Sequence, residues 1–98
     1  MKQYRIDAYV IDTLMADLVL HDRQPSALLV YLYLSCRTAG ARRNQVSTSH
    51  QEMADATGLS KSAVQQATRA LRRRKLLDVN RENQTAVPTY TVLRPWRR

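Results

Sequence analysis

Residues 49–75 predict two helices joined by a tight turn, and this pair constrains the fold more than any other feature. Ser49 and Glu52 have the spacing of a capping box, so a short helix should begin at residue 50 and run to about residue 57. Gly58 stands where a helix can end in a left-handed turn. Ser60 is a suitable N-cap for a longer helix that ends near Lys75.

The longer helix has one apolar face and one polar, basic face. Val64, Ala67 and Leu71 are three and four residues apart, which is the spacing of a helix face that packs against a core. The polar face carries Lys61, Ser62, Gln65, Gln66, Arg69 and Arg73. Of the continuous run Arg72, Arg73, Arg74 and Lys75, only one or two side chains can face a common partner, because the run goes round the helix.

Two further helices are predicted before this pair. Apolar residues at Ile11, Leu14, Met15 and Leu18 indicate an amphipathic helix over about 9–20. A second helix should begin at Pro25 and end near Ala39, with Gly40 as its C-cap. This second helix is apolar around most of its girth, as is typical of a helix at the centre of a core. The stripe of the first helix is then buried either on the second helix or against another subunit, and we expect a homodimer.

A β-hairpin is predicted after the helices, with strands over 76–80 and 87–93 and a polar loop between them. Pro88 indicates that the second strand lies at a sheet edge or begins late. Val46, isolated in a polar basic stretch, is expected to form a one-residue bridge to the sheet. The fold class is therefore α+β, mainly α with a small hairpin. We expect an N-terminal helical extension over 1–24, a domain over 25–93 and a basic tail over 94–98.

The net charge of +8 is confined to the second half of the chain. Residues 1–41 carry four basic and four acidic residues, whereas residues 42–98 carry twelve basic residues against four acidic ones. This asymmetry favours a polyanionic partner for the second half over a merely solvated basic surface. The acidic residues of the first half recur every five positions, a step of about 140° on a helix. We therefore expect them to be separate, solvated charges: Asp7, Asp12, Asp17 and Asp22.

Several functional classes find no support in the residues. With only Gly40 and Gly58 as glycines, the chain has no glycine-rich phosphate loop. His21 and His50 stand apart from any metal-ligand spacing. We expect no enzymatic activity, no cofactor and no bound metal. The single Cys36 excludes an internal disulfide and is expected to be a small core residue. With no visible signal peptide and no apolar run near the ~20 residues of a membrane span, a cytoplasmic location is expected.

Residues 49–77 resemble the helix-turn-helix of bacterial winged-helix regulators. The matching positions are Ala54, Gly58, Leu59, Ser60, Val64, Ala67 and Leu71, and the hairpin of residues 76–93 resembles the wing. MarR-like and GntR-like regulators and the DNA-binding parts of some plasmid and phage replication initiators share this pattern. The resemblance covers about residues 25–93. Such regulators usually carry a ligand-sensing or dimerisation region, for which this chain has little room.

The resemblance implies sequence-specific binding of double-stranded DNA by a small transcriptional regulator. A replication-initiator or mobile-element module is a first alternative, and a winged-helix adaptor for proteins or RNA is a second. Trp96 is expected to anchor the tail against the domain. The implied DNA contacts come from the two helices (Ser49, Ser60, Lys61, Ser62, Gln65, Gln66, Arg69, Arg73), from the wing tip (Arg81, Asn83) and from the preceding loop (Arg42, Arg43).

Overall fold

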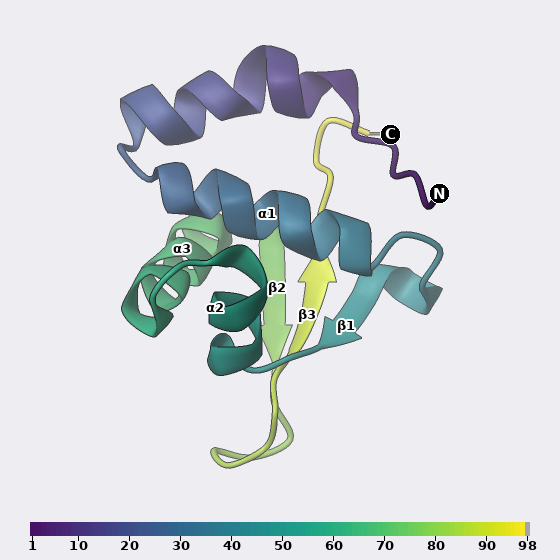
Figure 1. Ribbon diagram of the computed structural model, residues 1–98, viewed down its shortest axis with the longest axis vertical. Helices are drawn as coiled ribbons and strands as arrows, with labels where there is room; N and C mark the ends of the chain where they lie inside the picture. The colour runs from purple at the N-terminus through teal and green to yellow at the C-terminus, as the bar shows by residue number, and fades with distance from the viewer. Residues whose placement is uncertain (98) are drawn as a thin grey trace.

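The computed structural model describes residues 1–97, which form helices on one side of a small antiparallel sheet (Figure 1). An N-terminal helix over 8–21 lies on the far side of α1 from the sheet (Figure 1). The labelled elements are α1 (Pro25–Arg37), β1 (Gln45–Ser47), α2 (His50–Thr57), α3 (Lys61–Arg73), β2 (Leu77–Asn80) and β3 (Thr89–Val92). The predicted α+β class is confirmed.

The local signals around the helix pair are confirmed. Ser49 Oγ accepts a hydrogen bond from the Glu52 amide at 3.0 Å, and the Ser49 amide donates to Glu52 Oε1 at 3.1 Å. Gly58 ends α2 with a φ of +81°, a conformation that strains any residue with a Cβ. Ser60 Oγ accepts from the Ala63 amide at 3.0 Å and starts α3. This helix ends at Arg73 rather than Lys75, because Lys75 itself takes a left-handed φ of +58°.

The sheet has the order β1-β3-β2, with every neighbouring pair antiparallel. Val46 pairs with Tyr90, so the predicted bridge is present as the middle of a three-residue strand. Pro88 lies just before β3, which is the central strand. Of the two interpretations of Pro88, the late start is therefore correct and the edge position is wrong. A proline inside a central strand would remove a donor from the ladder.

Helix α1 forms the centre of the core, as its apolar girth predicts. Val30, Tyr31 and Leu34 are buried, and α1 packs against α3 on one side and the N-terminal helix on the other. The helix ends at Arg37, earlier than predicted. Thr38 replaces Gly40 as the C-cap, because its hydroxyl donates to the Leu34 carbonyl at 2.8 Å. Gly40 instead turns the chain beyond the cap, with a φ of +75°.

The N-terminal helix buries most of the predicted stripe: Leu14 and Leu18 are buried and Met15 packs partly against the core, but Ile11 does not. It contains two π-helical segments, η1 (Val10–Leu14) and η2 (Asp17–His21), in which amides bond to carbonyls five residues back. This winding is slower than that of an α-helix, so residues four apart face the same way. Val10, Leu14 and Leu18 enter the core of the same chain, whereas Ile11 remains 49% exposed. The homodimer stays a prediction.

The C-terminal segment is held against the N-terminal helix. The Trp96 ring stacks on Tyr9 with ring centroids 4.7 Å apart, which confirms its predicted role as an anchor. Trp96 Nε1 donates to Asp7 Oδ2 at 2.8 Å, and the Arg97 guanidinium donates to both Asp7 oxygens at 2.6 and 2.7 Å. The prediction of a solvated Asp7 is therefore wrong, and residues 94–97 are not a free tail. Arg98 lies outside the described residues.

A second ion pair fixes the other end of the N-terminal helix. Arg74 Nε and Nη2 donate to the two carboxylate oxygens of Asp22 at 2.5 and 2.9 Å, and Arg74 Nη1 lies 3.8 Å from Asp17. The prediction of a solvated Asp22 is wrong as well. We call the contacts of Asp7 with Trp96 and Arg97, together with the Asp22–Arg74 pair, the clasp. They join the neutral first half of the chain to the basic second half.

Candidate nucleic-acid interface

The outward face of α3 presents the predicted polar and basic side chains. Val64, Ala67 and Leu71 are buried on the inner face, as predicted. Positions 61, 65, 69 and 72 fall within about 80° of one another around a helix, so they form a stripe along α3. The exposed residues of this face are Lys61, Ser62, Gln66, Arg69, Arg72 and Arg73, and Gln65 is half-buried.

A cleft separates this stripe from the hairpin. Gln65, Thr68, Arg69 and Arg72 form its α3 wall, and four residues from other segments complete it: His50 at the start of α2, Val79 on β2, Arg81 beyond β2 and Tyr90 on β3. The cleft lies there because α3 packs against β2, while α2 precedes α3 by a single tight turn. Residues far apart in sequence thus place several cationic groups around one depression.

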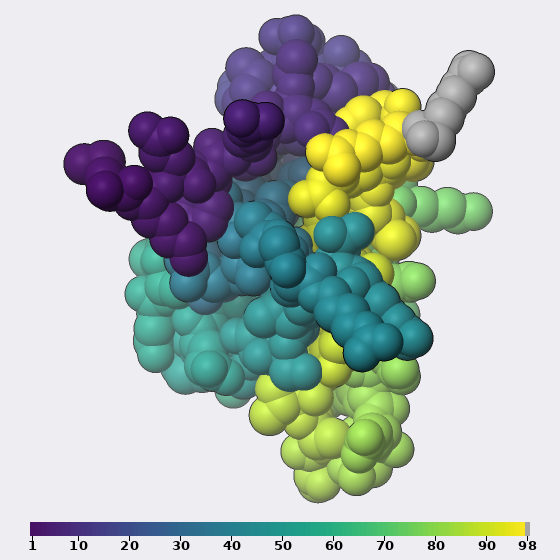
Figure 2. All heavy atoms as spheres, turned by 90° about the vertical axis from the view of Figure 1, so that its right-hand side faces the viewer, coloured from purple at the N-terminus to yellow at the C-terminus, as the bar shows by residue number. Residues whose placement is uncertain are grey.

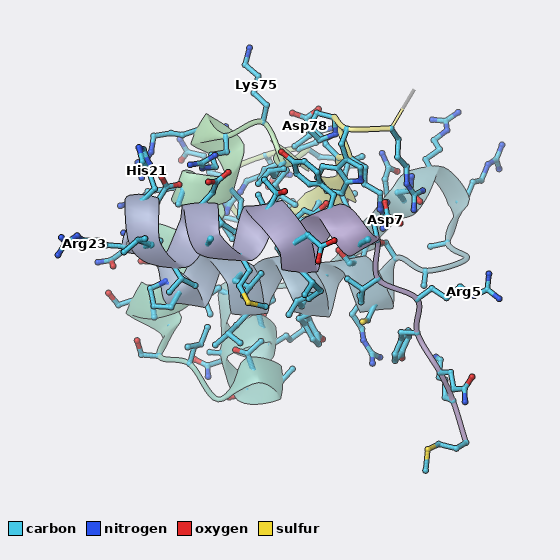
Figure 3. All side chains as sticks on the ribbon, turned by 90° about the horizontal axis from the view of Figure 1, so that it is seen from above. Arg5, Asp7, His21, Arg23, Lys75 and Asp78 are labelled. Atoms are coloured by element: carbon cyan, nitrogen blue, oxygen red, sulfur yellow. The ribbon has the colours of Figure 1, made fainter. Side chains whose placement is uncertain are left out.

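A second hollow continues the basic surface toward the C-terminal end of α3. Arg69 and Arg72 line it together with Arg73 and Lys75, and its floor is apolar, from Leu77 and Leu93. The carboxylate of Asp78 is its one acidic lining group. Figure 3 shows Lys75 projecting away from the body of the protein. Since Arg69 and Arg72 line both depressions, the cleft and this hollow form one continuous surface.

The arginines of this surface have no carboxylate partner. Among residues 1–97, the arginines that form ion pairs with aspartate are Arg74 and Arg97, both in the clasp. Hydrogen bonds from Arg97 and Trp96 lower the pKa of Asp7 to about 2. Hydrogen bonds from Arg74 and His21 lower the pKa of Asp22 well below its usual range. The aspartates of the first half therefore neutralise arginines away from the outer face of α3, whose own arginines form no ion pair among residues 1–97.

The serine caps use their hydroxyl oxygens as acceptors. Ser49 Oγ and Ser60 Oγ accept backbone amides of Glu52 and Ala63, so only their O–H groups remain to donate to an outside acceptor. Ser49 is half-buried and Ser60 is exposed. Both predicted contact residues therefore serve first as helix caps that orient α2 and α3.

The hairpin tip uses some of its polar groups internally. Asn83 Oδ1 accepts from the Thr85 amide at 3.0 Å and from the Thr85 hydroxyl at 2.8 Å, which shapes the turn. Arg81 donates to the Gln84 carbonyl at 3.3 Å while lining the cleft. Figure 2 shows the loop between β2 and β3 extending beyond the body of the protein. Arg81 therefore belongs to the same surface as α3, whereas Asn83 first stabilises the loop.

Arg42 and Arg43 lie apart from the α3 surface. They occupy a short 3-10 turn, η3 (Arg42–Asn44), that leads into β1. Strand β1 is one edge of the sheet, and α3 packs against β2, which is the opposite edge (Figure 1). The structure therefore does not bring these two exposed arginines together with Arg69 and Arg81, and their contact with flanking phosphates stays a prediction.

His50 lines the cleft but is not among the predicted contacts, although it starts the helix that is expected to cross the DNA backbone. It is the first residue of α2, and helix periodicity alone does not say which neighbour that position faces. Burial, with help from the charges of Arg81, Lys61 and Arg69, lowers the pKa of the imidazole. One sequence signal could have indicated this position: His50 directly follows the N-cap Ser49 and precedes the basic helix α3.

Comparison of the chain with models of known protein families, with curated proteins and with solved structures gave no match. No helix among the described residues is long and apolar enough to cross a membrane. Within the same residues, no group of three or more His, Cys, Asp or Glu side chains is placed to hold a metal ion. The function is therefore inferred from the geometry and charges of the chain itself.

Proposed function

We propose that this protein is a winged helix-turn-helix protein that binds double-stranded DNA, with α3 in the major groove. The observation that carries the proposal is the surface of Lys61, Arg69, Arg72, Arg73 and Arg81, whose cations have no carboxylate partner within the described chain. Such a surface suits the phosphates of nucleic acid, which supply the larger part of the affinity of most DNA-binding proteins.

The dimensions of α3 support this role. Its 13 residues give a length of about 20 Å. Its outward face is polar along this whole length, and a major groove about 12 Å wide admits one α-helix. The element order α1, β1, α2, α3, β2, β3 also matches the winged helix-turn-helix that the sequence resembles. In this arrangement the hairpin is the wing, and Arg81 contacts the backbone or the minor groove.

The N-terminal half of α3 is the proposed reader of base edges. Side chains on the first turns of a recognition helix reach the bases, and Gln pairs with adenine while Arg or Lys pairs with guanine. The residues in this position are Lys61, Ser62, Gln65, Gln66 and Arg69. Arg73 lies at the other end of the helix and Lys75 lies just beyond it, where both are suited to phosphate contacts.

Substitutions along α3 test this division. Gln65→Ala or Arg69→Ala should reduce the preference for the selected sequence by about 1–3 kcal/mol, whereas Arg73→Ala should weaken binding to all sequences alike. The measurement is the dissociation constant on a selected duplex and on a scrambled one. Equal losses on both duplexes for all three variants would remove the base-reading role.

The proposed biological role is that of a small transcriptional regulator. A replication-initiator or mobile-element module would use the same surface in the same way. Selection of bound sequences from a random duplex library tests DNA binding, sequence preference and half-site symmetry together, and symmetric half-sites would support the homodimer. If the protein instead retards single-stranded RNA but not duplex DNA in an electrophoretic mobility shift assay, it is a winged-helix adaptor for RNA.

A further inference from the structure

We propose that His50 binds a DNA phosphate in its protonated form, within the cleft between α3 and the hairpin, so that duplex binding takes up a proton. This inference rests on the proposed function and adds to it a phosphate site and a dependence on pH. His50 is half-buried and lines the cleft together with Gln65, Arg69, Arg72 and Arg81. A phosphate in this cleft would meet cationic groups from α2, α3 and the hairpin at once.

The charged surroundings of His50 favour its neutral form in the free protein. Lys61, Arg69 and Arg72 approach from α3, and Arg81 approaches from the end of β2. From β3 comes Tyr90, a phenol whose pKa burial raises, so it stays uncharged. None of the described residues that line the cleft is Asp or Glu.

On α2 itself, the nearest carboxylate is already committed to another group. Glu52 accepts the Ser49 amide through Oε1 as part of the capping box, so it does not serve as the partner of the imidazole. Burial first, and then the cations around it, therefore lower the pKa of His50. The free protein therefore favours the uncharged imidazole.

A bound phosphate reverses the balance. A negative charge within a few ångströms of an imidazole favours its protonated form, in which both ring nitrogens donate hydrogen bonds. The pKa of His50 should therefore rise when duplex DNA binds. A group that gains a proton on binding makes the affinity increase as the pH falls through the interval between its free and bound pKa values.

The other cations of the surface do not titrate in this interval. Lysine and arginine keep their charge across neutral and mildly acidic pH, so they contribute an affinity that is constant there. The remaining histidine, His21, provides a matched control. Its side chain is 80% exposed, bonds to Asp22 and does not line the cleft.

The experiment measures the dissociation constant on a duplex of about 25 base pairs, at about pH 7.5 and about pH 5.5 and at constant ionic strength. Wild type and His21→Gln should bind about tenfold more tightly at the lower pH, the gain expected from one charge-assisted hydrogen bond to phosphate. His50→Gln should bind with the same affinity at both values. Circular dichroism of all three proteins at both values establishes that they are folded.

A second measurement follows the His50 ring itself by NMR. Its pKa should move upward when the duplex is added to the intact protein, while the ring signals of His21 should not change on addition of the duplex. Binding that persists in wild type without dependence on pH, or a dependence that survives in His50→Gln, overturns this inference and leaves the proposed function standing. A folded wild-type protein that binds no duplex at either pH overturns both.

Discussion

The arginines of this protein work in two different settings. In the clasp, Arg74 and Arg97 each donate two hydrogen bonds to an aspartate that belongs to the N-terminal segment. On the outer face of α3, Arg69 and Arg72 line two depressions that hold a single carboxylate between them, that of Asp78. Arg72 and Arg74 are two positions apart in sequence, yet they belong to different settings.

The difference shows how a strongly basic sequence can fold and still keep a charged surface. Three of the four aspartates of the first half, Asp7, Asp17 and Asp22, form ion pairs with Arg97 or Arg74. Among residues 1–97, no aspartate of the first half forms an ion pair with an arginine on the outer face of α3. Arginine in the clasp therefore stabilises the fold, whereas the arginines on the outer face of α3 form no ion pair among residues 1–97.

The largest stability effect in the clasp should come from Trp96→Ala. The change removes the stacking on Tyr9, the edge contact with Tyr31 at 6.3 Å and the hydrogen bond to Asp7. We expect a loss of about 2 kcal/mol in the free energy of unfolding, since an aromatic pair and a hydrogen bond to a carboxylate disappear together. Chemical denaturation measures it, and Trp96→Phe should lose less.

The Trp96→Ala variant also tests whether the clasp and the outer face of α3 have separate roles. Under conditions where Trp96→Ala is fully folded, its affinity for duplex DNA should equal that of wild type, because the ring belongs to the clasp. An unchanged free energy of unfolding combined with weaker DNA binding would move Trp96 into the interface and contradict the division into two settings.

A smaller effect is expected from Asp22→Asn. The Asp22–Arg74 pair is partly exposed, with 20% and 30% of the two side chains accessible, so its loss should lower the free energy of unfolding by about 1 kcal/mol at neutral pH. Binding to duplex DNA should not weaken. If Asp22→Asn lost more free energy of DNA binding than free energy of unfolding, the assignment of Arg74 to the clasp would be contradicted.

The pH dependence of stability sharpens this prediction. Arg74 holds the pKa of Asp22 below its unfolded value of about 3.9. The unfolded state therefore binds more protons than the folded state in acid. The stabilisation is fully present above about pH 4 and is lost as the pH falls toward the folded pKa. The free energy of unfolding should decline less steeply in Asp22→Asn than in wild type over this range.

Signals that act within a few residues were predictable from the sequence. The capping box of Ser49 and Glu52, the left-handed turn at Gly58 and the N-cap at Ser60 depend only on near neighbours, and all three are present. The inward positions of α3 follow from its periodicity. The pairing of Val46 with β3 could be expected only as a bridge, because its partner Tyr90 is distant in the sequence.

The clasp and the cleft depend on contacts that no local pattern reports. Asp7 and Asp22 find their arginines 90 and 52 residues away, so a five-residue spacing could not reveal those pairs. The π-helical winding of the first helix replaced Ile11 with Val10 in the core. His50 reaches the cleft only because the hairpin folds back beside α3. Local sequence signals determined where the helices begin and end, whereas tertiary packing determined which arginines form ion pairs.

The salt dependence of duplex binding tests the central claim most directly. If six phosphates are neutralised, the logarithm of the binding constant should fall with the logarithm of the salt concentration at a slope of about −5. In Arg72→Ala/Arg73→Ala the slope should become shallower by about 2, because each change removes one phosphate contact. The matched variant Arg5→Ala/Arg37→Ala, which removes the same charge from exposed residues away from α3, should keep the wild-type slope. Binding that is insensitive to salt, or an equal change of slope in both variants, would contradict the account.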